Sequence, residues 1–154
     1  MNEPTIAARL AELGIELPEP SVAGLYRPAV RTRDQVYVSG QVAARDGAIV
    51  HPGRLGAEVA LEQGQEAARV CAVNALGAAH ALLGSLEGLR VIRLGVYVAS
   101  APDFTQQPQV ANAASELLRD LFGEEQGMGA RAAIGVAALP LNSPVELELL
   151  LEVD

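Results

Sequence analysis

The sequence predicts a two-layer α+β domain, in which a mixed sheet of about six strands carries two helices on one face. Two stretches, 61–83 and 103–122, repeat apolar residues at helical spacing, and short β-rich stretches precede, separate and follow them. A long helix between two strands is typical of a crossover connection. The 154 residues are 50% hydrophobic and 19% charged, so we expect one domain, 1–154, with residues 1–20 as an N-terminal extension.

Three helices are predicted from apolar spacing. Residues 5–13 form a short amphipathic helix, and 61–83 form the clearest one, which Gly84 ends. Residues 103–122 carry the third, with a continuous apolar stripe. Asn74 lies in the middle of the second helix, where we expect its amide to satisfy a backbone group.

Short stretches with β-branched or alternating residues predict the strands. They cover residues 26–30, 35–41, 44–50, 89–99, 132–139 and 145–153. The stretch 132–139 has no charged or polar side chain, so we expect a strand that is buried on both faces. Because the short connection LPLNSP follows it, we expect it to pair antiparallel with 145–153.

Both long helices on one side would leave the other face of the sheet bare. With so little charge in the composition, that face is expected to pack against a copy of the same chain. The sequence therefore predicts a homo-oligomer.

Composition also disfavours several classes of function. The net charge is −8, and the eleven basic residues, all Arg, are scattered, so a nucleic-acid partner is disfavoured. The only cysteine, Cys71, sits in an apolar helical pattern, which favours a small buried residue over a nucleophile. No signal peptide and no apolar run of membrane-spanning length is present, so we expect a cytoplasmic protein. His51 and His80 show no metal-ligand spacing and no phosphate loop is present, so we expect no metal and no cofactor.

The candidate chemistry rests on a few polar residues in apolar settings. Arg131 precedes the apolar run, and a guanidinium can pair bidentately with a small carboxylate. Glu146 could place a water molecule as a general acid or base if burial raises its pKa. Tyr26 and Ser39 supply hydroxyl groups near glycines. The pattern alone favours a strand-end role for Arg131 and an outward-facing role for Glu146, and a structural role is equally open for the two hydroxyl groups.

Three segments resemble motifs of one family. GLY at 24–26, SGQ at 39–41 and ARAAIGVAALPLNSPVELE at 130–148 are similar to the RidA family, also called YjgF/YER057c/UK114. The resemblance covers residues 22–153 and is closer to a longer-chain branch of the family. The C-terminal segment, with its Arg, apolar strand, Leu-Pro and Val-x-x-Glu pattern, is the more specific part.

The resemblance implies a chorismate-mutase-like fold and a homotrimer with clefts between subunits. It also implies an enamine/imine deaminase that hydrolyses reactive 2-imino acids to 2-oxo acids and ammonia, a small carboxylate being the substrate. By this resemblance Arg131 binds the substrate carboxylate, Glu146 positions water, and Tyr26 and Ser39 line the cleft.

The chain departs from the family in ways that bear on its activity. Many members have Ser and then Cys after the Arg, where this chain has Ala132 and Ala133, and Gly129 replaces a proline. The Arg and Glu roles do not need a thiol. Two other functions remain open: a non-catalytic module that binds small carboxylates in the same cleft, and a ribonuclease, which the acidic balance disfavours.

Overall fold

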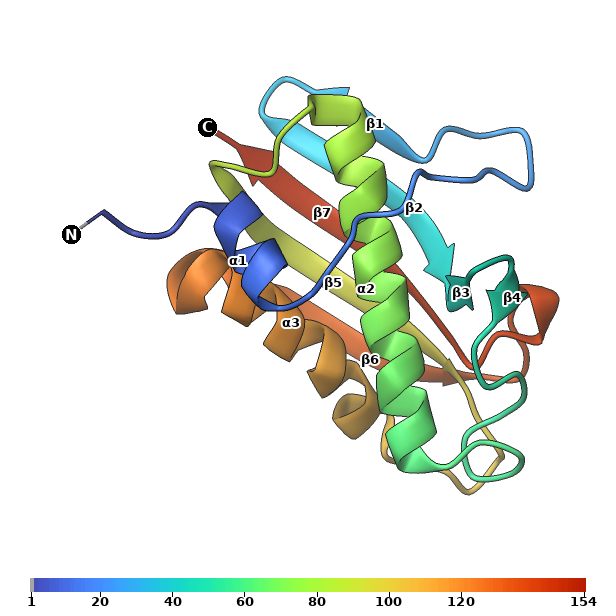
Figure 1. Ribbon diagram of the computed structural model, residues 1–154. Helices are drawn as coiled ribbons and strands as arrows, with labels where there is room; N and C mark the ends of the chain where they lie inside the picture. The colour runs from blue at the N-terminus through green and yellow to red at the C-terminus, as the bar shows by residue number, and fades with distance from the viewer. Residues whose placement is uncertain (1) are drawn as a thin grey trace.

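A five-stranded mixed sheet carries two long helices on one face (Figure 1). This computed structural model describes residues 2–154 and confirms the predicted α+β fold, with a separate two-stranded ribbon beside the sheet. In chain order the elements are α1 (Ile6–Glu12), β1 (Ala29–Thr32), β2 (Gln35–Val42), β3 (Ala44–Arg45), β4 (Ala48–Ile49), α2 (Leu61–Leu83), β5 (Leu89–Ala99), α3 (Gln107–Gly127), β6 (Ala130–Val136), a 3-10 turn (Pro140–Asn142) and β7 (Val145–Val153).

The strand order in the sheet is β1-β2-β7-β5-β6. The pair β5–β6 is parallel, because α3 forms the crossover between the two strands, and all other pairs are antiparallel. The predicted pairing of the apolar strand with 145–153 is wrong. Strand β5 lies between β6 and β7, and the LPLNSP connection passes from one side of β5 to the other instead of forming a hairpin.

Strand β6 also corrects the expectation that this segment is buried on both faces. It is an edge strand, and most of its seven residues are exposed, with Ile134 exposed to 49%. The apolar composition suggested an interior strand, but no strand of residues 2–154 lies beyond β6. An apolar edge strand of this kind is a surface that invites pairing or packing with another molecule.

The core lies between the sheet and the pair α2–α3. Alanines and leucines dominate both helices, and the small side chains of α2 allow close contact with α3 and with the strands. Gly84 ends α2 in a left-handed conformation, with φ 79°. Cys71 is buried in this core, as expected, and its thiol donates to the carbonyl of Val145 at 3.3 Å. No helix within residues 2–154 combines the length and the apolar character needed to cross a membrane.

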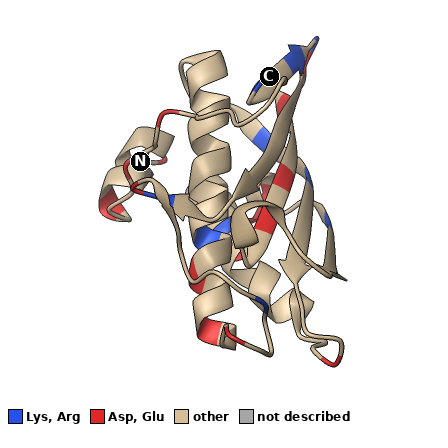
Figure 2. Cartoon of the chain, turned by 90° about the vertical axis from the view of Figure 1, so that its right-hand side faces the viewer, with Lys and Arg blue, Asp and Glu red and all other residues tan. Residues whose placement is uncertain are grey.

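The sheet face opposite the helices carries polar side chains. Alternate residues of β7 point there, and Figure 2 shows acidic and basic residues spaced along the strands. The phenol of Tyr97 donates to Glu148 Oε1 at 2.7 Å, and Arg93 Nη1 lies 3.3 Å from the same oxygen. Gly95 leaves room for this cluster, since a Cβ there would lie 2.7 Å from the Arg93 guanidinium. Among residues 2–154, no helix covers this face (Figure 1).

Asn74 ties α2 to the sheet. Its amide nitrogen donates to the carbonyl of Val42 at 3.1 Å and to that of Ala44 at 2.9 Å. These carbonyls lie where β2 ends and β3 begins, so one side chain holds the ribbon against the helix. The expected role of Asn74 in satisfying backbone groups is confirmed.

Replacing Asn74 by Ala should lower the free energy of unfolding by about 1–3 kcal/mol, because two partly buried carbonyls lose their donor. Urea denaturation would measure the change. Gln65→Ala is the matched control: it removes another amide on α2, whose bond to the Gln109 carbonyl is exposed, so a change within about 0.5 kcal/mol is expected. Equal losses in the two variants would contradict the proposed role of Asn74.

Candidate functional site

A cavity of about 400 Å³ opens on the edge of the sheet where the loop before β1 meets β2 and β7. Its walls come from residues 18–26, the end of β2, the β3–β4 turn and the turn at 140–141. The volume falls within the range of about 300–1,000 Å³ that proteins use for small ligands. Two of the predicted site residues, Tyr26 and Glu146, line it.

Glu146 points into this cavity from the open face of the sheet. Its neighbours across the two ladders are Val42 on β2 and Tyr97 on β5. Strand β2 changes register between Val38 and Gln41, and at this irregularity lies Gly40, where a Cβ would collide with Glu146 Oε1. The absence of a side chain at Gly40 therefore creates the space that the carboxylate occupies.

The environment of Glu146 favours its protonated form. Burial raises the pKa of its carboxyl above the ordinary value, and the neighbouring charge of Glu148 raises it further. A carboxyl with a raised pKa is better matched to proton transfer near neutral pH.

Tyr26 and Ser39 take different positions. The Tyr26 ring lines the cavity and packs over Gly24, where a Cβ would lie 3.0 Å from Tyr26 Cε1. The Ser39 hydroxyl donates to the carbonyl of Arg27 at 2.6 Å, and the Ser39 amide donates to that of Pro28 at 2.9 Å. Ser39 thus holds the loop that carries Tyr26, and its side chain does not line the cavity in this chain.

Arg131 lies elsewhere. It is opposite Leu94 on β5, whereas Glu146 is opposite Tyr97, three positions further along the same strand and on its other side. Leu94 faces the helices, and so does Arg131, whose Nη1 donates to Asn112 Oδ1 at 2.8 Å and to Ser115 Oγ at 3.0 Å on α3. The chain by itself therefore does not bring Arg131 and Glu146 together.

The turn at 140–143 forms one wall and is conformationally strained. Leu141 and Asn142 both have φ 58°, in the left-handed region that side chains such as leucine rarely adopt. Buried Ser143 anchors the turn: its hydroxyl accepts from the Ala43 amide at 3.0 Å and donates to the Val145 carbonyl at 2.7 Å. Leu141 is thereby held 70% exposed at the mouth of the cavity. Strained residues of this kind concentrate at functional sites.

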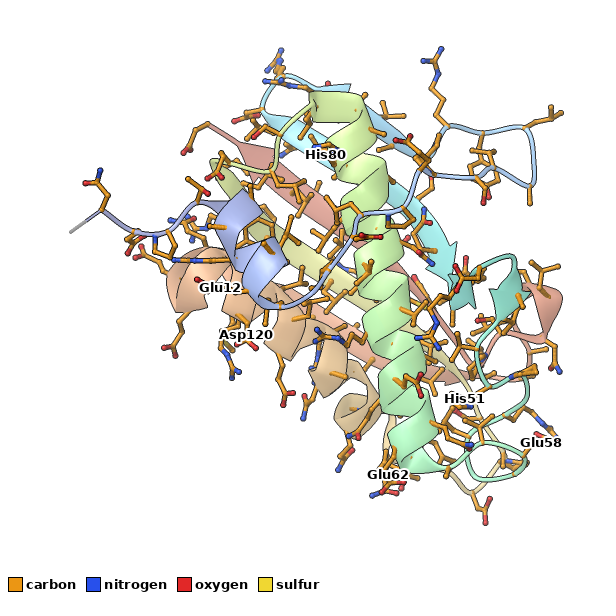
Figure 3. The ribbon with its side chains drawn as sticks, in the orientation of Figure 1. Glu12, His51, Glu58, Glu62, His80 and Asp120 are labelled. Atoms are coloured by element: carbon orange, nitrogen blue, oxygen red, sulfur yellow. The ribbon has the colours of Figure 1, made fainter. Side chains whose placement is uncertain are left out.

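The charges around the cavity are of one sign. Glu19, Asp46 and Glu146 line it, and no Arg or Lys does. Among residues 2–154 no group of three or more His, Cys, Asp or Glu side chains could hold a metal ion. His51 and His80 lie near opposite ends of α2 (Figure 3). A substrate carboxylate would therefore need a cation from outside this chain's own part of the cavity.

Sequence reasoning missed several lining residues. Leu141, Asp46, Pro18 and Asn74 all line the cavity, although their segments are far apart in the chain. The sequence offered one signal: Asp46-Gly47 marks a tight turn, and turns at strand ends often carry binding residues. A leucine in a left-handed conformation has no such signal.

Leu141→Gly is expected to raise the free energy of unfolding modestly. Glycine removes a left-handed penalty of about 1–2 kcal/mol, part of which is offset by the greater freedom of glycine in the unfolded chain, about 0.5–1 kcal/mol. Leu25→Gly is the control, because Leu25 is fully exposed at 108% but lacks a positive φ. Leu25→Gly should therefore only lower the free energy of unfolding, through the greater freedom of glycine in the unfolded chain. Urea denaturation of both variants would measure these changes. An equal decrease in the two variants would contradict strain at Leu141.

Glu146→Gln should become more stable relative to the native chain as pH rises. The pKa of Glu146 is higher in the folded chain than in the unfolded chain. The contribution of the carboxyl to the stability of the native chain is therefore fully present below its pKa in the unfolded chain, and it is lost as pH rises through its pKa in the folded chain. The two proteins should therefore unfold similarly in acid and diverge towards neutral pH. Chemical denaturation across this range would test it, with Glu152→Gln on the same strand as the control. A difference in the free energy of unfolding between Glu146→Gln and the native chain that does not change with pH would contradict the burial of the Glu146 charge.

Comparison with known proteins agrees with this architecture. The model of the family described as Endoribonuclease L-PSP matches residues 17–153. Protein TCP17 of Trypanosoma cruzi is 43% identical over 151 residues, which cover 97% of this chain and 94% of that protein. The crystal structure of Atu1372 from Agrobacterium tumefaciens, a protein of unknown function, is 42% identical and has a TM-score of 0.90 over 97% of this chain and 94% of its own.

A solved structure from Shewanella oneidensis is 30% identical and has a TM-score of 0.92 over 97% of this chain and all of its own. Both structural relatives thus extend over nearly the whole chain, and the family match includes every candidate site residue. The chain belongs to the Endoribonuclease L-PSP family, the YjgF/RidA family that its motifs resemble.

Proposed function

We propose that this protein is an enamine/imine deaminase that hydrolyses reactive 2-imino and 2-enamino acids to 2-oxo acids and ammonia. The observation that carries the proposal is the Glu146 carboxylate, which is half-buried in a ligand-sized cavity beside Tyr26 and has a raised pKa. A carboxyl whose pKa is raised is better suited to accept and return a proton during catalysis.

The reaction needs a water molecule and one proton shuttle. An enamine first tautomerises to the imine, gaining a proton at its β-carbon and losing one from its nitrogen. The water oxygen then bonds to the imine carbon while one of its protons passes to ionised Glu146, and the C=N electron pair moves to nitrogen, which takes up that proton. In the second half Glu146 takes the hydroxyl proton and delivers it to nitrogen, the C–N bond breaks, and ammonia leaves a 2-oxo acid.

The substrate carboxylate is proposed to bind Arg131 of a second copy. The only charged groups that line the cavity of one chain are carboxylates. Arg131 sits exposed on an edge strand, on the far side of β5. A planar guanidinium is suited to bidentate carboxylate binding. We propose a homotrimer in which β6 of one copy approaches the Glu146 cavity of the next, since a head-to-tail contact that closes forms a ring.

Two surfaces support an oligomer of this kind. The apolar edge strand β6 and the open face of the sheet are both uncovered by the described residues. Packing β6 against a neighbouring copy would remove exposed apolar surface from water.

The ribonuclease activity in the family's name has less support here. Phosphate backbones are bound by Lys and Arg, and the cavity is lined instead by Glu19, Asp46 and Glu146. A non-catalytic role would use the same cavity, and it would appear as carboxylate binding without release of ammonia.

Subunit mixing tests both the chemistry and the shared site. Glu146→Gln should lower ammonia release from freshly generated 2-iminopropionate by about 100-fold or more, the usual contribution of a positioned proton-transfer group. Arg131→Ala should lower it by at least about tenfold, because the substrate carboxylate loses a charge-assisted bond. A trimer that contains both variants has one interface at which the Glu146→Gln copy supplies an intact Arg131 and the Arg131→Ala copy supplies an intact Glu146. If the site is shared in this way, that interface is active. Equal mixing of the two variants by co-refolding should then restore roughly a quarter of the native activity, from the statistics of a closed ring.

Arg90→Ala is the matched control, because Arg90 is an exposed arginine of β5 outside the cavity, and it should retain full activity. No recovery on mixing would show that the two residues act within one copy or not at all. Arg131→Ala that is as active as the native chain would overturn the deaminase proposal.

A further inference from the structure

A second cavity, of about 620 Å³, lies on the outer side of α2. The segment that follows α1 forms one wall, the β3–β4 ribbon forms another, and one face of α2 forms the third. Its floor is aliphatic: Ile15 and Leu17 come from the segment, and Val70 and Val73 come from α2. The cavity is separate from the Glu146 carboxylate, which does not line it.

The segment is seated on α2 by close packing. It runs across the helix on its way to β1 (Figure 1), and Gly77 lies directly beneath Pro18. A Cβ on Gly77 would collide with the Pro18 carbonyl oxygen. The N-terminal extension therefore has a defined position, and it encloses a cavity that the helix and the ribbon alone would leave open.

The charged groups around this cavity divide into two sets. Glu66 is already satisfied, since Arg45 lies 3.3 Å from one of its oxygens and His51 2.7 Å from the other. By contrast the guanidinium of Arg69, a half-buried residue of α2, makes no hydrogen bond or ion pair with any group of residues 2–154. Glu16 on the segment and Asp46 in the ribbon turn likewise make no ion pair in this part of the chain.

These three charges suit a ligand that carries both signs. The unpartnered guanidinium of Arg69 is suited to a carboxylate. The unpaired carboxylates of Glu16 and Asp46 are suited to an ammonium group. The aliphatic floor is suited to an apolar side chain.

We propose that this cavity binds a free aliphatic α-amino acid. Its carboxylate pairs with Arg69, its ammonium group faces Asp46 and Glu16, and its side chain rests on Val70, Val73 and the segment. This site does not depend on the deaminase proposal, because neither Arg131 nor Glu146 lines it.

The two cavities share a wall. Pro18, Ala44, Asp46 and Asn74 line both of them. An experiment must therefore separate binding in the second cavity from binding beside Glu146, and variants of residues that line only one cavity make that separation.

Isothermal titration calorimetry of the full chain with L-leucine tests the proposal. Two analogues each lack one charge: 4-methylpentanoate has no ammonium group, and 3-methylbutylamine has no carboxylate. Leucine should bind, and both analogues and glycine should bind at least about tenfold more weakly, since each loses a charge-assisted bond or the apolar contact. Binding of 4-methylpentanoate as tight as that of leucine would overturn a site for both charges.

Variants locate the binding. Arg69→Ala, and Arg69→Gln as a second variant that keeps the aliphatic stem, should weaken leucine binding at least about tenfold. Gly77→Ala should weaken it as well by displacing the segment at Pro18. Arg90→Ala, which lines neither cavity, and Glu146→Gln should leave it unchanged. Circular dichroism would check that each variant is folded.

No binding of leucine at millimolar concentration, or binding that Glu146→Gln abolishes and the Arg69 variants do not, would overturn the proposal. The second of these results would place the amino acid in the other cavity. Loss of ammonia release in Glu146→Gln with leucine binding intact would show that the two proposals stand or fall separately.

Discussion

The position of β5 between β7 and β6 is the constraint on which the candidate site depends. Because β5 pairs with β7 on one side and with β6 on the other, Glu146 and Arg131 come to lie on opposite sides of it and on opposite faces of the sheet. Neighbouring strands lie about 4.8 Å apart, so neither side chain can pass through the sheet to meet the other. The same order makes β6 an exposed apolar edge. A site that uses both residues therefore requires a second copy of the chain.

The raised pKa of Glu146 arises first from burial, which the backbone geometry creates, and then from the neighbouring charge of Glu148. Register slips in β2 where Gly40 lies, and the space above that glycine receives the carboxylate. Burial there raises the pKa of Glu146, while Ser143 and the strained Leu141–Asn142 turn close the cavity from the other side. Much of the site is thus formed by loops that are anchored to the core through single polar side chains, the half-buried Asn74 and the buried Ser143.

The N-terminal extension contributes surface as well as length. Its seating at Gly77 gives α2 a covered outer face and completes a cavity whose unpaired charges come from three different elements. The shared residues Pro18 and Asn74 also place this cavity next to the candidate active site.

The sequence by itself determined the layers, both long helices to within a few residues, and the bounds of 61–83, 89–99 and 145–153, because apolar periodicity and turn residues are local signals. Its motifs also identified the family. Only the tertiary structure decided the strand order, the exposure of β6 and the separation of Arg131 from Glu146. An apolar stretch has the same sequence pattern whether it is covered by its own chain or by a partner, so the pattern does not distinguish the two cases. Which strand lies beside which depends on long-range pairing through α3, and no local pattern encodes that pairing.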